Sequence, residues 1–116
     1  MKNIEVEVDW PPSANKNWMI RRGRFVSTDA AACYKRLIKD LSYTWEKITF
    51  LKDIEITIKA FPPDKRKRDI DNLLKVTLDS LQNTHLFEND EQIRKITIER
   101  MHKCDKGKLQ IRLEGE

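Results

Sequence analysis

The chain has 116 residues, of which 39% are hydrophobic and 36% charged, and its formal net charge is +4. This composition is typical of a globular protein, and no apolar run approaches the roughly 20 residues that a membrane-spanning helix needs. The length fits one domain over residues 1–116. The N-terminus lacks the basic-then-apolar order of a signal peptide, so we expect a cytoplasmic protein with no membrane partner.

The first predicted element is a strand over residues 3–10, where polar and apolar residues alternate. Pro11 and Pro12 end it, because proline donates no backbone hydrogen bond. Residues 13–27 have no period and contain turn-forming residues, so we expect an exposed loop there. The apolar side of the strand comprises Ile4, Val6, Val8 and Trp10.

An amphipathic helix follows, which Ser27 or Thr28 can cap and which has Asp29 in its first turn. After this helix, residues 53–61 alternate and predict a second strand, which a Pro-Pro pair ends. The expected apolar face of the helix comprises Ala30, Cys33, Tyr34, Leu37, Ile38, Leu41 and Trp45.

A second helix is predicted to begin near Asp69 or Asp71, and a polar loop over residues 88–91 follows it. Alternation then predicts a strand around residues 96–98 and a last strand over residues 109–113. The order β-α-β-α-β-β predicts an α/β (α+β) fold, with a mixed four-stranded sheet and two main helices packed on it. The expected buried stripe of the second helix comprises Ile70, Leu73, Leu74, Thr77, Leu78 and Leu81.

Three aspartates form the candidate metal site. Asp69 and Asp71 are two residues apart at a helix start, so in an extended segment their carboxylates project to the same side. A helix of about 12–14 residues and its return loop could bring Asp90 back toward them. Oxygen ligands without His or Cys favour Mg²⁺, with Mn²⁺ as a substitute. Lys75 lies four residues after Asp71 and could neutralise charge on a phosphodiester.

Each of these residues also has a purely structural interpretation. Asp69 or Asp71 could cap the helix, Asp71 and Lys75 could form an ordinary helical ion pair, and Asp90 could be a turn residue. The two cysteines, Cys33 and Cys104, are far apart in sequence and fit free thiols.

Two basic clusters favour a phosphate backbone as the partner, although a charge run alone also fits a solvated surface. One cluster ends directly at Asp69, and the other surrounds Gly23 in the predicted loop. The candidate DNA-binding residues are Lys65, Arg66, Lys67, Arg68, Arg21, Arg22, Arg24, Asn15 and Lys16.

Four segments resemble RusA-like Holliday junction resolvases. Residues 10–15 resemble the W-P-P-S-x-N opening of that family, and residues 63–75 resemble its P-D-x-R-x-R-D-x-D-N-L-x-K core. Residues 79–81 and 89–92 resemble its D-x-L and D-D-x-Q segments. The core motif is specific, because every fixed position agrees in type and spacing.

The resemblance implies a homodimeric, Mg²⁺-dependent endodeoxyribonuclease that resolves four-way branched DNA by paired symmetric nicks, in recombination and repair. It implies catalytic roles for Asp69, Asp71, Asp90 and Lys75, a nucleoid-associated enzyme of bacterial or prophage origin, and no small-molecule cofactor. One departure stands out, since Asn89 occupies the place of the first acid of the D-D pair.

Two other functions are weighed. A non-catalytic module that binds branched DNA would not need the acidic set, which repels phosphate unless a metal is present. A nuclease of the P-D…E-x-K class is disfavoured, because no Glu-x-Lys follows Pro63-Asp64.

Overall fold

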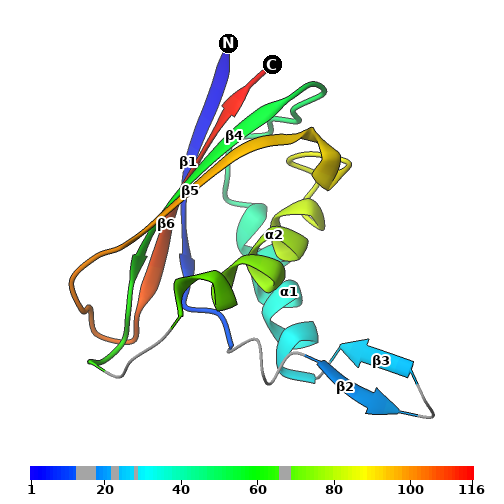
Figure 1. Cartoon of the computed structure of the whole chain (residues 1–116). Coiled ribbons are helices and arrows are strands. Elements are labelled where there is room, and N and C mark those ends of the chain that lie inside the picture. The colour runs from blue at the N-terminus through cyan, green and yellow to red at the C-terminus, as the bar shows by residue number, and fades with distance from the viewer. Residues whose placement is uncertain (13–17, 22–23, 28, 66–68) are drawn as a thin grey trace.

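The computed structural model describes residues 1–12, 18–21, 24–27, 29–65 and 69–116 (Figure 1). It is an α+β domain with a four-stranded mixed sheet and two helices, as the sequence predicts. No helix among these residues is long and apolar enough to cross a membrane. The elements are β1 (Lys2–Asp9), β2 (Trp18–Arg21), β3 (Arg24–Ser27), α1 (Asp29–Ser42), β4 (Ile54–Phe61), η2 (Ile70–Leu73), α2 (Leu74–Gln82), η3 (Asp90–Gln92), β5 (Ile93–Arg100) and β6 (Lys108–Gly115).

The sheet has the strand order β1-β6-β4-β5. The pairs β1–β6 and β6–β4 are antiparallel, whereas β4 and β5 run parallel. A parallel pair needs a crossover connection, and the segment containing η2, α2 and η3 supplies it. Both helices lie on the same face of the sheet (Figure 1).

The core lies between that sheet face and the helices. Period-2 alternation directs every second side chain toward the helices, so Ile56 of β4, Ile111 of β6 and Val8 of β1 are all buried. Tyr34 of α1 is buried among them, and its hydroxyl donates to the backbone oxygen of Asp9 over 2.6 Å. Burial first, and then the charge of Asp9, raises the pKa of Tyr34 above its ordinary value.

The expected loop over residues 13–27 is wrong in part, because β2 and β3 pair antiparallel as a hairpin. Arg21 pairs with Arg24 at one end of the hairpin, and the two strands project away from the sheet (Figure 1). The element order therefore contains two more strands than the sequence predicts. Thr28, one of the two predicted helix caps, lies outside the described residues.

The buried face of α1 is narrower than predicted. Ala31, Tyr34 and Ile38 are buried, whereas Cys33 is exposed and Leu37 is 44% exposed. Ala30 is also exposed, and Trp45 lies beyond the end of the helix, partly buried against the core. Apolar residues spaced three and four apart in the sequence can form more than one stripe on a helix. The buried stripe is the one that packs against the sheet.

The second helix begins with a 3-10 turn, η2, and becomes α-helical at Leu74. Such turns are common at helix N-termini. Its predicted stripe is confirmed for Leu73, Thr77 and Leu81, which are buried. Ile70, Leu74 and Leu78 are only partly buried, while Val76 and Ser80 are buried as well.

Candidate active site

Asp69 and Asp71 begin the crossover helix with exposed carboxylates. Asp69 occupies the N-cap position of η2 in an extended conformation, but its side chain makes no capping hydrogen bond. Asp71 lies inside the 3-10 turn. Within the part of the chain that the structure describes, neither carboxylate forms an ion pair or hydrogen bond. The capping interpretation of Asp69 is therefore not supported, and both carboxylates are available to a ligand.

Arg100, the last residue of β5, lies beside this pair. It lines a shallow pocket together with Asp69, Ile70 and Asp71. The side chain of Arg100 is exposed and makes no ion pair with the described residues. A cation with five donors beside two open carboxylates can bind a phosphate that the carboxylates alone would repel.

Lys75 lies in the first turn of α2, one residue after Leu74. Its Nζ is 3.7 Å from Asp79 Oδ2, and 60% of the lysine side chain is exposed. An exposed pair of this kind contributes little stability, about 0.3–0.5 kcal/mol. The contact with Asp79 therefore does little to hold Lys75 away from an anionic ligand.

Asp90 does not come back to Asp69 and Asp71 within one chain. It begins η3, which leads directly into β5, whereas Asp69 and Asp71 share a pocket with Arg100 at the other end of that strand. A strand of 8 residues spans about 23 Å. Among the described residues, no group of three or more acidic, His or Cys side chains could hold a metal ion. The expected convergence of three aspartates in one protomer is therefore absent from that part of the chain.

The family model described as Endodeoxyribonuclease RusA matches residues 9–114. The chain belongs to the RusA family. The crossover junction endodeoxyribonuclease of Enterobacteria phage HK97 is 32% identical over 114 residues, covering 97% of this chain and 95% of the relative. The protein of the same name from Escherichia coli K12 is 28% identical over 112 residues, covering 96% and 93%. That from Enterobacteria phage 82 is 27% identical over 112 residues, with the same coverage.

Asn89, which replaces the first acid of the D-D pair typical of the RusA family, has a structural role. Asn89 is the N-cap of η3, and its Oδ1 accepts a hydrogen bond from Glu91 N over 2.9 Å. Aspartate and asparagine cap helices about equally well. The amide therefore replaces an acid without loss of the cap, directly beside Asp90.

Gln92 is a positioning residue that belongs to the motif but to which the sequence assigns no role. Its Oε1 accepts from Glu88 N and Asn89 N, and its Nε2 donates to Phe50 O over 2.8 Å and to Lys52 O over 3.0 Å. One side chain thus fastens η3 to the segment before β4. The capping-box spacing of residues 89 and 92 is the sequence signal that indicates this role.

Only part of the predicted DNA-binding set can be placed. Lys65 is exposed in the segment before η2. Arg21 is the last residue of β2, and Arg24, its partner, is the first residue of β3. Outside the described residues lie Arg66, Lys67, Arg68, Arg22, Asn15 and Lys16.

Sequence reasoning missed a basic segment that follows β5. Cys104 N donates to Pro62 O over 2.8 Å, so residues 101–107 run beside the segment that leads toward Asp69. Lys103 and Lys106 are exposed on it. At the turn, Gly107 has a φ of +71°, and a Cβ there would come within 3.0 Å of Trp10 Cβ and 2.9 Å of Pro63 Cδ. Trp10, Pro63 and Gly107 therefore lie close together.

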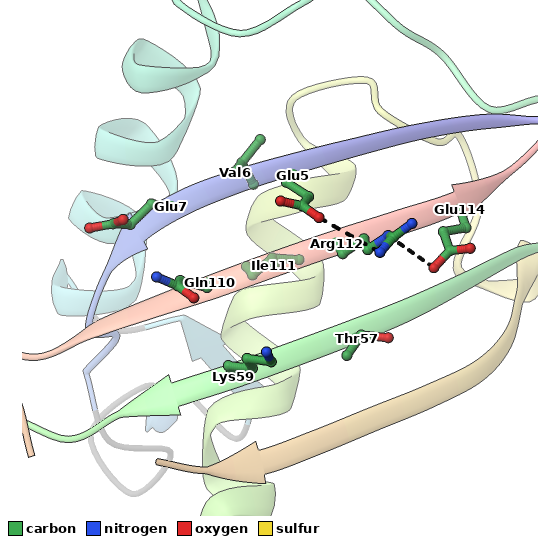
Figure 2. Close-up of a pocket in the computed structure, with 9 residues that line it drawn as sticks. All are labelled: Glu5, Val6, Glu7, Thr57, Lys59, Gln110, Ile111, Arg112 and Glu114. Carbon is green, nitrogen blue, oxygen red and sulfur yellow. Dashed lines mark ion pairs between the residues drawn. The ribbon is translucent and has the colours of Figure 1, made fainter. Parts of the chain in front are cut away.

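The sheet face away from the helices does not suit DNA. Figure 2 shows a pocket on this face, which Glu5, Glu7 and Glu114 line with only Arg112 and Lys59 as bases. Arg112 is already paired, with its Nε 3.0 Å from Glu114 Oε1 and its Nη1 3.7 Å from Glu5 Oε1. The acids repel phosphate, which leaves the end of the molecule with Asp69, Asp71 and Arg100 as the candidate active site.

Proposed function

We propose that this chain is a Mg²⁺-dependent endodeoxyribonuclease that resolves four-way DNA junctions by paired symmetric nicks, acting as a homodimer. The observation that carries the proposal is the pair of open carboxylates, Asp69 and Asp71, beside Arg100 at the end of β5. The names of the relatives, crossover junction endodeoxyribonucleases, support the choice of substrate.

The donors at this site fit a hard divalent cation. Asp69 and Asp71 supply exposed carboxylate oxygens without competing partners among the described residues, and carboxylates, carbonyls and waters are the ligands that Mg²⁺ and Mn²⁺ prefer. When bound, such an ion stabilises charge on the phosphoryl group and activates water. Arg100 and Lys75 would bind the phosphodiester oxygens and orient the scissile bond for in-line attack.

Asp90 joins this site if a second protomer supplies it. Asp90 and the Asp69–Asp71 pair lie at opposite ends of β5. A two-fold dimer can bring Asp90 of one protomer to the carboxylate pair of the other, and it can do so twice. Two identical sites related by a two-fold axis also match the two-fold symmetry of a four-way junction.

The first test is cleavage of a labelled synthetic junction with Mg²⁺, Mn²⁺ or EDTA, beside linear duplex of the same sequence. We expect symmetric nicks on the junction alone, only with metal. Asp69→Asn and Asp71→Asn should abolish cleavage and preserve junction binding. The control Asp40→Asn, which alters an exposed carboxylate of α1, should cut normally. Cleavage retained by both active-site variants would falsify the assignment of the metal ligands.

A mixing experiment tests the role of Asp90. The Asp69→Asn and Asp90→Asn proteins should each be inactive alone. If Asp90 acts across the dimer, a mixed dimer carries one intact site and one doubly altered site, so single nicks should return on mixing. No recovery after subunit exchange would restrict Asp90 to its own chain or to a structural role.

Binding of the junction without cleavage in any metal would instead favour the second candidate function, a module that recognises branched DNA.

A further inference from the structure

The Trp-Pro-Pro segment of residues 10–12 has no part in the proposed reaction, yet it leaves the sheet at the same end as Arg100. In the strand register, the end of β1 lies beside the start of β6, the start of β6 beside the end of β4, and the end of β4 beside the end of β5. These neighbours form one row across the sheet, which comprises Asp9, Lys108, Phe61, Ala60 and Arg100.

Two backbone hydrogen bonds tie the chain that leaves β5 to the chain that leaves β4. Met101 N donates to Ala60 O over 2.8 Å, and Cys104 N donates to Pro62 O over 2.8 Å. The first chain follows directly on β5, and the second runs on to η2. The bonds therefore fasten together the two segments that border the row of strand ends.

Gly107 touches the other two segments at this end of the sheet, through Trp10 and Pro63. Its φ is +71°, a conformation that favours glycine. A Cβ on Gly107 would lie 2.9 Å from Pro63 Cδ, 3.0 Å from Pro63 N and 3.0 Å from Trp10 Cβ. These atoms belong to a backbone, a proline ring and a Cβ, so no side-chain rotation makes room for a methyl group. We refer to this meeting of Trp10, Pro63 and Gly107 as the edge contact.

Helix α1 anchors the edge contact to the core. Tyr34 is buried, and its hydroxyl donates to Asp9 O over 2.6 Å. Asp9 is the last residue of β1 and directly precedes Trp10. The hydrogen bond therefore fixes the point at which the chain leaves the strand and enters the edge contact.

We propose that the edge contact positions Arg100 against the carboxylates of Asp69 and Asp71, an inference that rests on the proposed function. Arg100 shares a pocket with both aspartates, and η2 lies against β5. One side of this pocket comes from the end of β5, and the other comes from the chain that follows β4. Trp10 and Gly107 are then positioning residues, which act on the reaction through Arg100.

The size of the effect follows from geometry. A shift between the chain that leaves β4 and the chain that leaves β5 changes the separation of the cation and the two carboxylates. A misplacement of about 1 Å can slow catalysis by about 10²-fold, even when the altered residue is far from the reacting atoms. Small displacements at the edge contact should therefore appear in the rate of cleavage and leave junction binding intact.

Gly107→Ala tests the edge contact directly, because the added methyl group must push Pro63 or Trp10 away. We expect the cleavage rate at saturating junction to fall at least about tenfold, and the dissociation constant of the junction in EDTA to change by less than about twofold. The control Val6→Ala leaves a core cavity under β1 and should keep the rate per folded enzyme.

A double-mutant cycle shows whether Gly107 acts through Arg100. In an Arg100→Ala background, Gly107→Ala should lower the rate by less than about twofold, because the group that it misplaces is gone. A general loss of stability would multiply with the loss of Arg100 instead. An equal fold-loss in both backgrounds would therefore overturn the positioning role.

Tyr34→Phe tests the same contact from α1 and keeps the proposal testable if Gly107→Ala does not fold. It removes only the hydroxyl that donates to Asp9 O. We expect about a threefold loss of cleavage rate with unchanged junction binding, and no further loss in the Arg100→Ala background. A loss of junction binding in place of the rate would contradict the inference.

Hydrogen exchange tests the edge contact without DNA or metal. Gly107→Ala should speed exchange at Met101 and Cys104, whose amides donate to the chain after β4, and also in η2. We expect at least about a fivefold increase on both sides of the pocket. Val6→Ala should change neither side.

The exchange result separates failure of the inference from failure of the proposed function. If exchange rises at Met101 and Cys104 but not in η2, the edge contact does not join the two sides of the pocket, and the inference is wrong even if junctions are cut. Cleavage by Gly107→Ala at the parent rate overturns it as well. A parent protein that cuts no junction, with faster exchange on both sides in Gly107→Ala, supports the coupling and removes the proposed function.

Discussion

The buried hydroxyl of Thr77 lowers the stability of the folded protein. It lies in α2, is 1% exposed, and its Oγ1 has no hydrogen-bond partner among the described residues. A buried polar atom without a partner costs about 1–3 kcal/mol. We predict that Thr77→Val, which keeps the shape and removes the hydroxyl, raises the free energy of unfolding by about 1 kcal/mol in urea denaturation.

The control for Thr77 is the neighbouring Ser80. It is also buried in α2, but its hydroxyl donates to Val76 O over 2.6 Å. Ser80→Ala removes a satisfied hydrogen bond and should therefore lower stability or leave it unchanged. A loss of stability in Thr77→Val would mean that its hydroxyl is satisfied in the folded protein.

Arg100 is the residue that the structure adds to the candidate site. We predict that Arg100→Ala lowers the cleavage rate at saturating junction at least tenfold, because a cation beside the scissile phosphate stabilises developing charge. Arg100→Lys should keep part of the activity, since it keeps the charge and loses the planar fork. Arg112→Ala, on the acidic sheet face, should cut normally, and an equal loss there would point to a general effect of net charge.

At the scale of elements, η3 depends on one side chain. Gln92→Ala removes hydrogen bonds to Phe50 O, Lys52 O and two backbone amides. We predict faster hydrogen exchange in residues 88–92 and a fall in cleavage, because Asp90 loses its fixed position. Glu91→Ala alters an exposed side chain of the same turn and should change neither. Normal cleavage with a loosened η3 would remove Gln92 from any positioning role.

Substitutions of Asn89, the N-cap of η3, test how much the cap contributes to stability and cleavage. Asn89→Asp keeps the acceptor for Glu91 N, so stability and cleavage should match those of the parent. Asn89→Ala should cost about 1 kcal/mol by chemical denaturation. If Asn89→Asp instead raised activity, the family's paired acid would have a role in metal binding that asparagine does not fill.

The sequence correctly predicted the elements whose pattern of apolar and polar residues fits only one structure. The alternation of β1, β4 and β6 fixed their buried faces, and the motif core located Asp69 and Asp71 at a helix start. The hairpin of β2 and β3 was not predicted, because each strand has only 4 residues and shows no clear alternation of apolar and polar residues. The place of Arg100 in the candidate site was not predicted either. Its proximity to Asp69 depends on the parallel pairing of β4 and β5, and this pairing joins residues that are distant in sequence.

The position of Asp90 shows a different limit. A helix and a return loop can bring Asp90 close to Asp69 and Asp71 or leave it far from them. The length of β5 separates them, because the two groups lie at its opposite ends. The motif alone suggests three aspartates that are neighbours within one chain. The structure places Asp90 at the far end of a strand of 8 residues instead.

At the scale of the whole molecule, charge is divided between two regions. The outer sheet face is rich in carboxylates, whereas Arg100 lies beside Asp69 and Asp71, and the exposed residues Lys103 and Lys106 follow Arg100 in the chain. We predict that Lys103→Ala or Lys106→Ala weakens junction binding and lowers the slope of log affinity against log salt by about 0.9 for each phosphate that is no longer neutralised. Lys59→Ala, on the outer face, should leave the slope unchanged. A uniform effect of all three would mean that only net charge matters.

The strand order also governs when the sheet can form during synthesis. β6 joins β1 to β4, yet it follows every other described strand in the chain. As the polypeptide leaves the ribosome, β4 and β5 can meet through their helical crossover, while β1 waits for a neighbour made about 100 residues later. Contacts so distant in sequence slow folding. A nascent chain therefore stays without a complete sheet until β6 has emerged.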